Sequence, residues 1–246
     1  QGRAEKEKLL AREEALKEET KKEREFMNLT SHQLLTPLSM IRGFISMLND
    51  GTLGELTPQQ KDAVLEVYDN TKRMIDLASE LLSVSRIQSD KLKLKITETH
   101  LEDLIANCVN EFNLTYPKQN VQLIYNKPTN LEPIKVDADK IRQVLLNFTE
   151  NAFKYTLEGH IKIIIEQSPE WTTVKVSDTG IGIQPEDFEK LFQPFFRGRN
   201  ILELDNQGTG LGLYIARLII ERHNGKIWAE NNPERGATFA FKLPMI

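Results

Sequence analysis

Residues 147–155 read NFTENAFKY and lie in a longer stretch, 139–155, whose periodicity predicts an α-helix. On a helical wheel this helix has a polar face, and its members lie within about 60° of Asn147. The face consists of Gln143, Asn147, Glu150, Asn151 and Lys154. Asparagine is only a middling helix former, so two asparagines one turn apart favour a binding face over a solvated one. An amide oxygen suits Mg²⁺, and a lysine suits phosphate.

Short β-branched runs and helical stretches alternate around this helix. The predicted strands are Val121–Tyr125, Ile161–Glu166, Thr173–Ser177, Lys226–Ala229 and Thr238–Leu243. The predicted helices are 101–113, 139–155 and 210–224. Together they predict an α/β sandwich, in which helices cover a mixed sheet.

Two glycine-rich stretches follow the helix at 139–155. In DTGIGI, residues 178–183, a buried Asp178 at a strand end can accept a hydrogen bond from an exocyclic amine. Gly180 and Gly182 would let the backbone approach a flat ring. The second stretch, GTGLGL at 208–213, precedes a helix whose free N–H groups can bind an anion. Its spacing fits neither a dinucleotide fingerprint nor a Walker loop.

The N-terminal part of the chain is helical in pattern. Residues 1–25 hold eight basic and eight acidic side chains, which predicts a charged, coiled-coil-like signalling helix. An apolar stripe then begins at Met27 and continues through Leu34, Leu38, Ile41, Ile45 and Leu48. Thr57-Pro58 starts a second helix with its own stripe, which runs from Val64 to Leu82. A hairpin with one narrow seam buries little surface, so two copies are expected to pair as a dimeric four-helix bundle.

His32 lies on the side of the first helix opposite its stripe. With Leu34 at 0°, His32 falls near 160° and Thr36 about 40° further round. Pro37 stands inside the same helix, where a proline costs roughly 3 kcal/mol. A histidine and a threonine on one outward face beside such a proline favour a functional role over plain solvation.

Composition excludes several classes of protein. The 246 residues are 39% apolar and 28% charged with a formal net charge of −4, so no basic excess indicates a nucleic-acid partner. No apolar run reaches the roughly 18 residues of a membrane span. Cys108 is the single cysteine, which excludes a disulfide framework. We expect a cytoplasmic fragment of a longer protein, because the chain starts at Gln1 without a secretory signal.

These motifs together resemble the sensor histidine kinases of two-component systems. SHQLLTP at 31–37 is similar to their phosphoacceptor box, whose usual form is SHELRTP. The resemblance implies that His32 accepts phosphate from ATP and that Thr36 helps to dephosphorylate the partner. Gln33 replaces the usual acid and Leu35 replaces an arginine. Glutamine accepts a hydrogen bond but takes no proton at neutral pH, so both departures concern the efficiency of transfer.

The second half resembles the ATP-binding domain of the same family. The resemblance implies that Asn151 binds Mg²⁺, that Asn147 lies near the phosphates, and that Asp178 reads the adenine amino group. It places Lys154 and Tyr155 beside the nucleotide, a hydroxyl such as that of Thr238 near the base, and a lid over residues 198–207. Arg197 borders the lid. The resemblance sets the second glycine box, with Gly208, Gly210, Leu211 and Gly212, at the triphosphate.

The expected fold is therefore α+β and multidomain. The expected domains are the charged helix at 1–25, the dimerisation and phosphotransfer hairpin at 26–92, and the catalytic ATP-binding domain at 93–246. The resemblance implies ATP and Mg²⁺ as cofactors, and a homodimer and a response-regulator receiver domain as partners. It also implies an upstream sensor domain, with membrane anchoring of the parent protein left open.

Two alternatives stay open at this point. Because Gln33 replaces the usual acid, a nucleotide-binding scaffold or a phosphatase-biased homologue stays an alternative. Because Glu150 could activate water, a free-standing ATPase is the second alternative. His100, His160 and His223 have no clustered carboxylates at ligand spacing and are expected to be surface or cap residues.

Overall fold

The computed structural model describes residues 18, 30–31, 33–88, 93–115, 120–198 and 208–245. The chain divides into two compact units, Gln1–Leu92 and Lys93–Ile246. The charged segment 1–25, apart from Glu18, lies outside the described residues, as does Met27.

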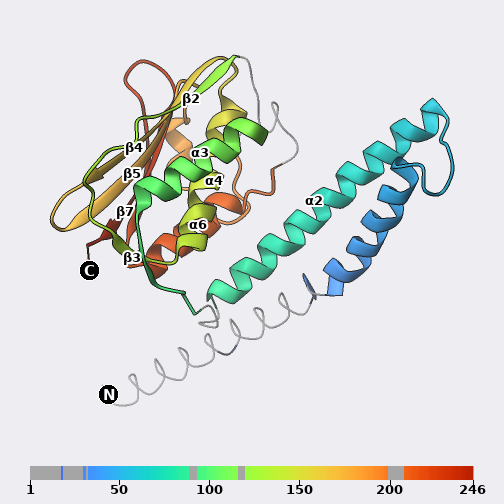
Figure 1. Cartoon of the computed structure of the whole chain (residues 1–246), viewed down its shortest axis with the longest axis horizontal. Coiled ribbons are helices and arrows are strands. Elements are labelled where there is room, and N and C mark those ends of the chain that lie inside the picture. Colours follow the sequence, from blue (N-terminus) through green and yellow to red (C-terminus); the bar gives the residue numbers. More distant parts are fainter. Residues whose placement is uncertain are drawn as a thin grey trace, which may run out of the picture. The chain divides into compact units, whose positions relative to one another are not determined.

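The first unit contains a helical hairpin (Figure 1). A helix covers residues 33–49, and helix α2 spans Pro58–Gln88. Thr57 caps α2 as predicted, because its Oγ1 accepts from the Gln60 N–H at 3.3 Å and the Gln60 side chain accepts from the Thr57 N–H at 2.9 Å. Leu38, Ile45, Thr71 and Ala78 form the buried seam. Pro37 lies inside the first helix.

The second unit is the predicted α/β sandwich. Its main sheet has five strands in the order β2-β4-β5-β7-β6. The strands are β2 (Val121–Tyr125), β4 (Gly159–Gln167), β5 (Trp171–Asp178), β6 (Lys226–Asn231) and β7 (Ala237–Pro244). The sheet is mixed, since β2 and β4 pair in parallel and the other neighbours pair antiparallel. A small second sheet pairs β1 (Thr97–Thr99) with β3 (Ile134–Val136).

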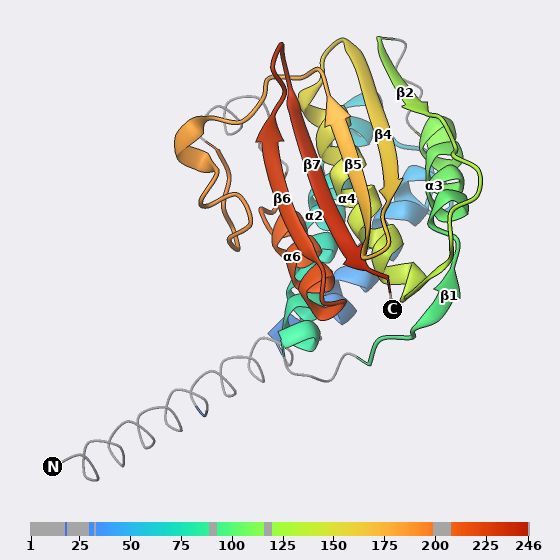
Figure 2. The ribbon, with the colours of Figure 1, turned by 90° about the vertical axis from the view of Figure 1, so that its left-hand side faces the viewer.

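Three helices cover one face of the main sheet (Figure 2). They are α3 (Leu101–Thr115), α4 (Ala138–Tyr155) and α6 (Gly212–Arg222), and a short 3₁₀ turn, η1, covers Pro185–Asp187. The core between the layers is aromatic: the ring of Phe148 on α4 lies 5.6 Å from Phe239 and 6.1 Å from Phe241 on β7. Phe148 is fully buried, so this contact fixes the rotation of α4 about its axis.

Candidate functional site

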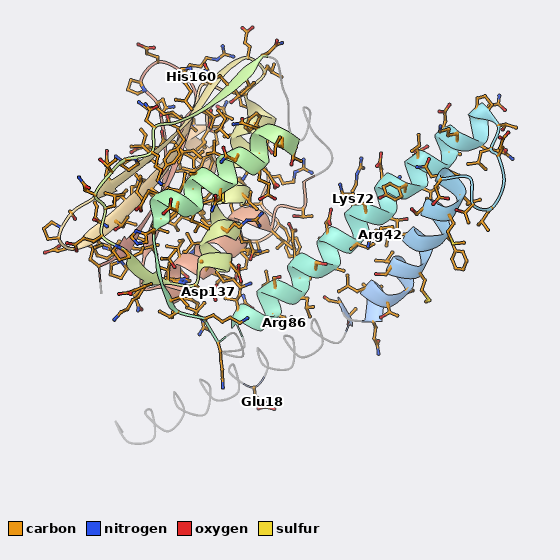
Figure 3. All side chains as sticks on the ribbon, viewed as in Figure 1. Glu18, Arg42, Lys72, Arg86, Asp137 and His160 are labelled. Carbon is orange, nitrogen blue, oxygen red and sulfur yellow. The ribbon has the colours of Figure 1, made fainter. Side chains whose placement is uncertain are left out.

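Helix α4 turns its polar face away from the sheet. Asp137 caps its amino end by accepting from the Lys140 N–H at 3.2 Å. In Figure 3, Asp137 and His160 mark opposite ends of the domain. Phe148 holds one side of the helix in the core, which leaves Asn147 and Asn151 half-buried on the other side. The Asn151 carboxamide donates to Asn147 Oδ1 at 3.3 Å. The two asparagines therefore form one hydrogen-bonded polar surface.

The second glycine box lies directly against this surface. A Cβ built on Gly212 would overlap the side-chain nitrogen of Asn147, so only glycine permits this approach. A Cβ on Gly208 would lie 3.0 Å from Lys154 Nζ and 3.9 Å from the Arg197 guanidinium. Two cations and Asn147 thus border one stretch of glycine-rich backbone, which is a setting suited to a polyphosphate.

Thr209, Gly210 and Leu211 lie between these two glycines and connect the box to the segment before it and to α6. Gly210 packs on the backbone of Phe195 and Phe196, with a built Cβ 2.8 Å from the Phe195 carbonyl carbon. The Leu211 N–H donates to Thr209 Oγ1 at 3.2 Å just before α6 begins. Of the predicted lid at 198–207, only Gly198 lies among the described residues.

Asp178 lies at the end of β5 and is buried. Its Oδ1 accepts from the Gly180 N–H at 2.8 Å and from the Ala237 N–H at 3.2 Å. Burial raises the pKa of the Asp178 carboxyl, and these two donors oppose that shift. Both bonds end on Oδ1, so Oδ2 is the oxygen with no hydrogen-bond partner among the described residues. A carboxylate held in this way can accept from an amine.

The loop after Asp178 packs on the carboxyl end of α4. The Ile181 N–H donates to the Tyr155 carbonyl at 3.2 Å, and a Cβ on Gly180 would overlap that same carbonyl oxygen. Gly182 lies near Asn231, whose carboxamide both donates to and accepts from the Ile183 backbone, at 2.7 and 2.8 Å. The loop and α4 therefore form a single continuous site, with Tyr155 at their junction.

Thr238 follows Ala237 at the start of β7 and is buried. Its hydroxyl donates to Asn232 Oδ1 at 2.6 Å and lies 2.9 Å from Ser177 Oγ. Sequence patterns did not single out Asn231 or Asn232. No local signal could have found them, because their partners lie up to 55 residues away in the chain.

The phosphoacceptor segment belongs to the other unit. His32 lies outside the described residues. Gln33 and Thr36 are both helical and exposed. They are therefore open to a partner or a substrate on the surface of the hairpin.

The remaining histidines are surface or cap residues, as predicted, but the expected absence of carboxylates near His100 is wrong. His223 caps α6 and is buried. His100 does lie in a cluster with Glu102 and Asp103, which the sequence reading missed. That cluster is poorly suited to a cation, because Asp103 pairs with Lys127 at 2.5 Å and the amino end of α3 carries a positive dipole.

Among the described residues, no helix combines the length and apolarity that crossing a membrane requires.

Two family models match the chain. Residues 22–90 match the His Kinase A (phospho-acceptor) domain. Residues 136–246 match the histidine kinase-, DNA gyrase B-, and HSP90-like ATPase family. The first contains His32, and the second contains the α4 surface, both glycine stretches and Thr238.

Known relatives match this chain across both of its parts. The sensor histidine kinase WalK of Bacillus subtilis is 34% identical over 228 residues, which cover 90% of this chain and 36% of WalK. The chain thus spans little more than a third of that relative's length. The histidine kinase ThkA, solved in complex with the response regulator protein TrrA, matches at 29% identity with a TM-score of 0.65, covering 95% of this chain and 66% of that one.

A third comparison supports the fold. Full-length ShkA, solved in complex with AMPPNP, matches with a TM-score of 0.76 at 24% identity, over 89% of this chain and 45% of ShkA. A phosphoacceptor hairpin followed by an ATP-binding domain of this fold is the arrangement found here. The chain belongs to the sensor histidine kinases of two-component systems.

Proposed function

We propose that this chain is an ATP-dependent protein histidine kinase that phosphorylates itself on His32. The observation that carries the proposal is the packing of the second glycine box on α4, where Gly212 meets Asn147, and Gly208 lies beside Lys154 and Arg197. The family models support it, because the phosphoacceptor and ATPase matches occur in the same chain and in that order.

The base end of ATP is assigned to the Asp178 loop. Asp178 Oδ2 would accept from the adenine amino group, and Gly180 and Gly182 would let the backbone lie flat against the ring. Tyr155 joins this loop to α4, so it would line the nucleotide between base and phosphates. Thr238 pairs with Ser177 across β5 and β7, so its hydroxyl lies on the sheet face opposite the Asp178 carboxylate, and we assign it no contact with the base.

The phosphate end is assigned to the glycine box and the cations beside it. The first N–H groups of α6 have no intrahelical partner and can donate to phosphate oxygens, with Gly210 and Leu211 leading into them. Lys154 and Arg197 would balance the charge. These contacts position the triphosphate and stabilise charge, which is most of what a phosphoryl-transfer enzyme must do.

Mg²⁺ fits the α4 surface. The Asn151 carboxamide uses its nitrogen to donate to Asn147, so its oxygen points elsewhere and is a suitable hard ligand. Asn151 would therefore hold the ion, with the triphosphate oxygens as further ligands. When bound, Mg²⁺ would neutralise charge on the β- and γ-phosphates.

Transfer would follow a simple displacement. An imidazole nitrogen of His32 attacks the γ-phosphorus, the bond from phosphorus to the β,γ-bridging oxygen breaks, and ADP leaves with the electron pair. The proton on the other imidazole nitrogen then passes to water, which leaves a neutral phosphohistidine. Gln33 can accept a hydrogen bond from the imidazole but cannot take that proton, so it would orient the ring.

The phosphoryl group would then pass to an aspartate of a response-regulator receiver. The solved ThkA complex contains a response regulator, and it supports the same class of partner for the hairpin of this chain. Thr36 is exposed on the helix that carries His32, where it could direct water onto the partner's phosphoaspartate. If so, Thr36→Ala lowers partner dephosphorylation more than autophosphorylation, and equal loss of both would refute the separate role.

The test is incubation with γ-labelled ATP and Mg²⁺, comparing the chain with His32→Gln. We expect label that is acid-labile, alkali-stable and absent from the variant. Bound nucleotide without label would instead favour the scaffold or phosphatase-biased alternative. Steady phosphate release without label would favour a free-standing ATPase with Glu150 activating water.

A further inference from the structure

The turn between β6 and β7 contains a side chain that ties together the two strands beneath the proposed base site. The Asn232 carboxamide donates to the Asp178 carbonyl at 2.7 Å. The same nitrogen lies 3.1 Å from Ser177 Oγ and 3.3 Å from the Ala237 carbonyl. One amide group therefore connects the end of β5 to the start of β7.

These contacts surround the hydrogen bond that orients the Asp178 carboxylate. Asp178 Oδ1 accepts from the Ala237 N–H, and Asn232 holds the backbone carbonyl of each of these two residues. Gly236, with φ at +89°, brings the turn so close that a Cβ there would overlap the Asp178 carbonyl oxygen. The position of the Asp178 carboxylate thus depends on the turn between β6 and β7. Asn232 is the side chain that hydrogen-bonds this turn to β5.

Asn232 also sets the direction of the Thr238 hydroxyl. A hydroxyl has one proton, and the contact to Asn232 Oδ1 at 2.6 Å is shorter than the one to Ser177 Oγ at 2.9 Å. The proton therefore points to Asn232, and the Thr238 oxygen keeps a lone pair for another donor. Ser177 and Thr238 are direct partners across β5 and β7, so their hydroxyl groups lie side by side on one face of the sheet.

From this geometry we propose that Asn232 is a positioning residue for recognition of the adenine amino group. It does not touch the nucleotide. It holds the main chain of Asp178 and Ala237 so that Oδ1 is occupied by backbone donors and Oδ2 is presented to the 6-amino group. The proposal rests on the proposed function, in which Asp178 reads the base.

The test separates base reading from folding by using two ligands. One is ADP, and the other is purine riboside 5′-diphosphate, which lacks the 6-amino group. Binding of both to the whole chain with Mg²⁺ is measured by calorimetry for the wild type, Asn232→Ala and Asn232→Asp. Asn110→Ala is the matched control, because Asn110 is exposed on α3.

We expect Asn232→Ala to weaken ADP binding about tenfold, the worth of one good hydrogen bond to a charged group. Binding of purine riboside 5′-diphosphate should change less than about twofold on the same grounds, because that ligand makes no bond to Asp178. Asn232→Asp keeps the acceptor for Thr238 but has no donor for the Asp178 and Ala237 carbonyls. This variant should therefore also lose the preference for ADP over purine riboside 5′-diphosphate. Asn110→Ala should match the wild type.

Each other outcome overturns the proposal in a distinguishable way. If both Asn232 variants weaken both ligands equally, or abolish binding of both, Asn232 is structural only. If both variants prefer ADP over purine riboside 5′-diphosphate as strongly as the wild type does, Asp178 is positioned without Asn232. If the wild type itself binds the two ligands equally, Asp178 does not read the base, and the assignment under the proposed function fails together with this inference.

Discussion

At the scale of single residues, the smallest change expected to disable the site is a methyl group on Gly212. A Cβ there would overlap the Asn147 side chain, so Asn147 must move and its hydrogen bond with Asn151 must break. Because the obstacle is a side chain and not backbone, the fold should tolerate Gly212→Ala. We expect autophosphorylation to fall at least about tenfold, measured as incorporation of γ-labelled phosphate.

The chain offers a matched glycine for comparison. A Cβ on Gly43 would meet no atom within 4 Å, and Gly43 lies in the helix over residues 33–49. Gly43→Ala should therefore keep the wild-type rate and stabilise its helix by up to about 1 kcal/mol. A wild-type rate in Gly212→Ala would show that Asn147 does not act at the phosphates.

Asn151→Ala tests the proposed metal ligand. Removing the carboxamide deletes the hard oxygen, but the fully buried core residues of α4 stay in place. We expect the affinity for a non-hydrolysable ATP analogue to lose most of its dependence on Mg²⁺, while metal-free binding stays close to that of the wild type. Calorimetry with and without Mg²⁺ measures both. An unchanged response to Mg²⁺ would place the ion elsewhere.

At the scale of elements, His223 joins the end of α6 to the start of α4. Its Nε2 accepts from the Asp137 N–H at 3.0 Å, and its Nδ1 donates to the Ile219 carbonyl at 2.8 Å. Both nitrogens are thus used by a neutral ring. Burial lowers the pKa of His223, against the opposing effects of the Ile219 carbonyl and the nearby Asp137. Protonation of His223 Nε2 would turn this acceptor into a donor that faces the Asp137 N–H, so the hydrogen bond between them would be lost.

This bridge predicts acid-sensitive stability of the second unit. The unfolded chain takes up the proton near pH 6.5 and the folded chain only below that, so the stabilisation is complete above 6.5 and is lost as the pH falls below it. Between pH 7.5 and 5.5 we expect the wild type to lose about 1 kcal/mol more than His223→Gln.

Urea unfolding followed by tryptophan fluorescence measures this difference. Trp171 and Trp228 are the only tryptophans and both lie in the second unit, so the signal reports on that unit alone. Equal losses in the two proteins would mean that His223 does not carry the pH dependence.

The elements also show what sequence patterns can predict here. All five strands of the main sheet and the three covering helices occur where β-branched runs and helical periodicity predict them. The strands β1 and β3 were missed, since three residues are too few for a pattern. Asn147 and Lys154, which the sequence places on one polar face of α4, lie beside Gly212 and Gly208. The sequence could not predict the Asn232 and His223 networks, because these depend on contacts between segments 54 and 86 residues apart.

At the scale of the whole molecule, one copy of the hairpin leaves much of its apolar surface exposed. Leu38 and Ile45 are buried in its seam, but Leu34 and Ile41 from the same predicted stripe are 43% and 45% exposed. Further large apolar side chains are exposed on the two helices: Met40, Phe44, Met47, Leu65, Val67, Met74 and Leu77. Such a surface on two helices is expected to be covered by a second hairpin.

The dimer prediction follows from that surface. In light scattering after gel filtration we expect twice the 28.3 kDa mass of the chain, and Ile41→Glu should shift the protein toward the monomer, because a buried unpaired carboxylate is costly at a helix interface. Leu114→Glu introduces the same charge at a side chain that is 85% exposed on α3, outside the hairpin, and should leave the dimer intact. If Ile41→Glu kept the dimeric mass, Ile41 would lie outside the interface. A monomeric wild type would remove the four-helix bundle from the proposed function, and His32 would then have to be phosphorylated within a single chain.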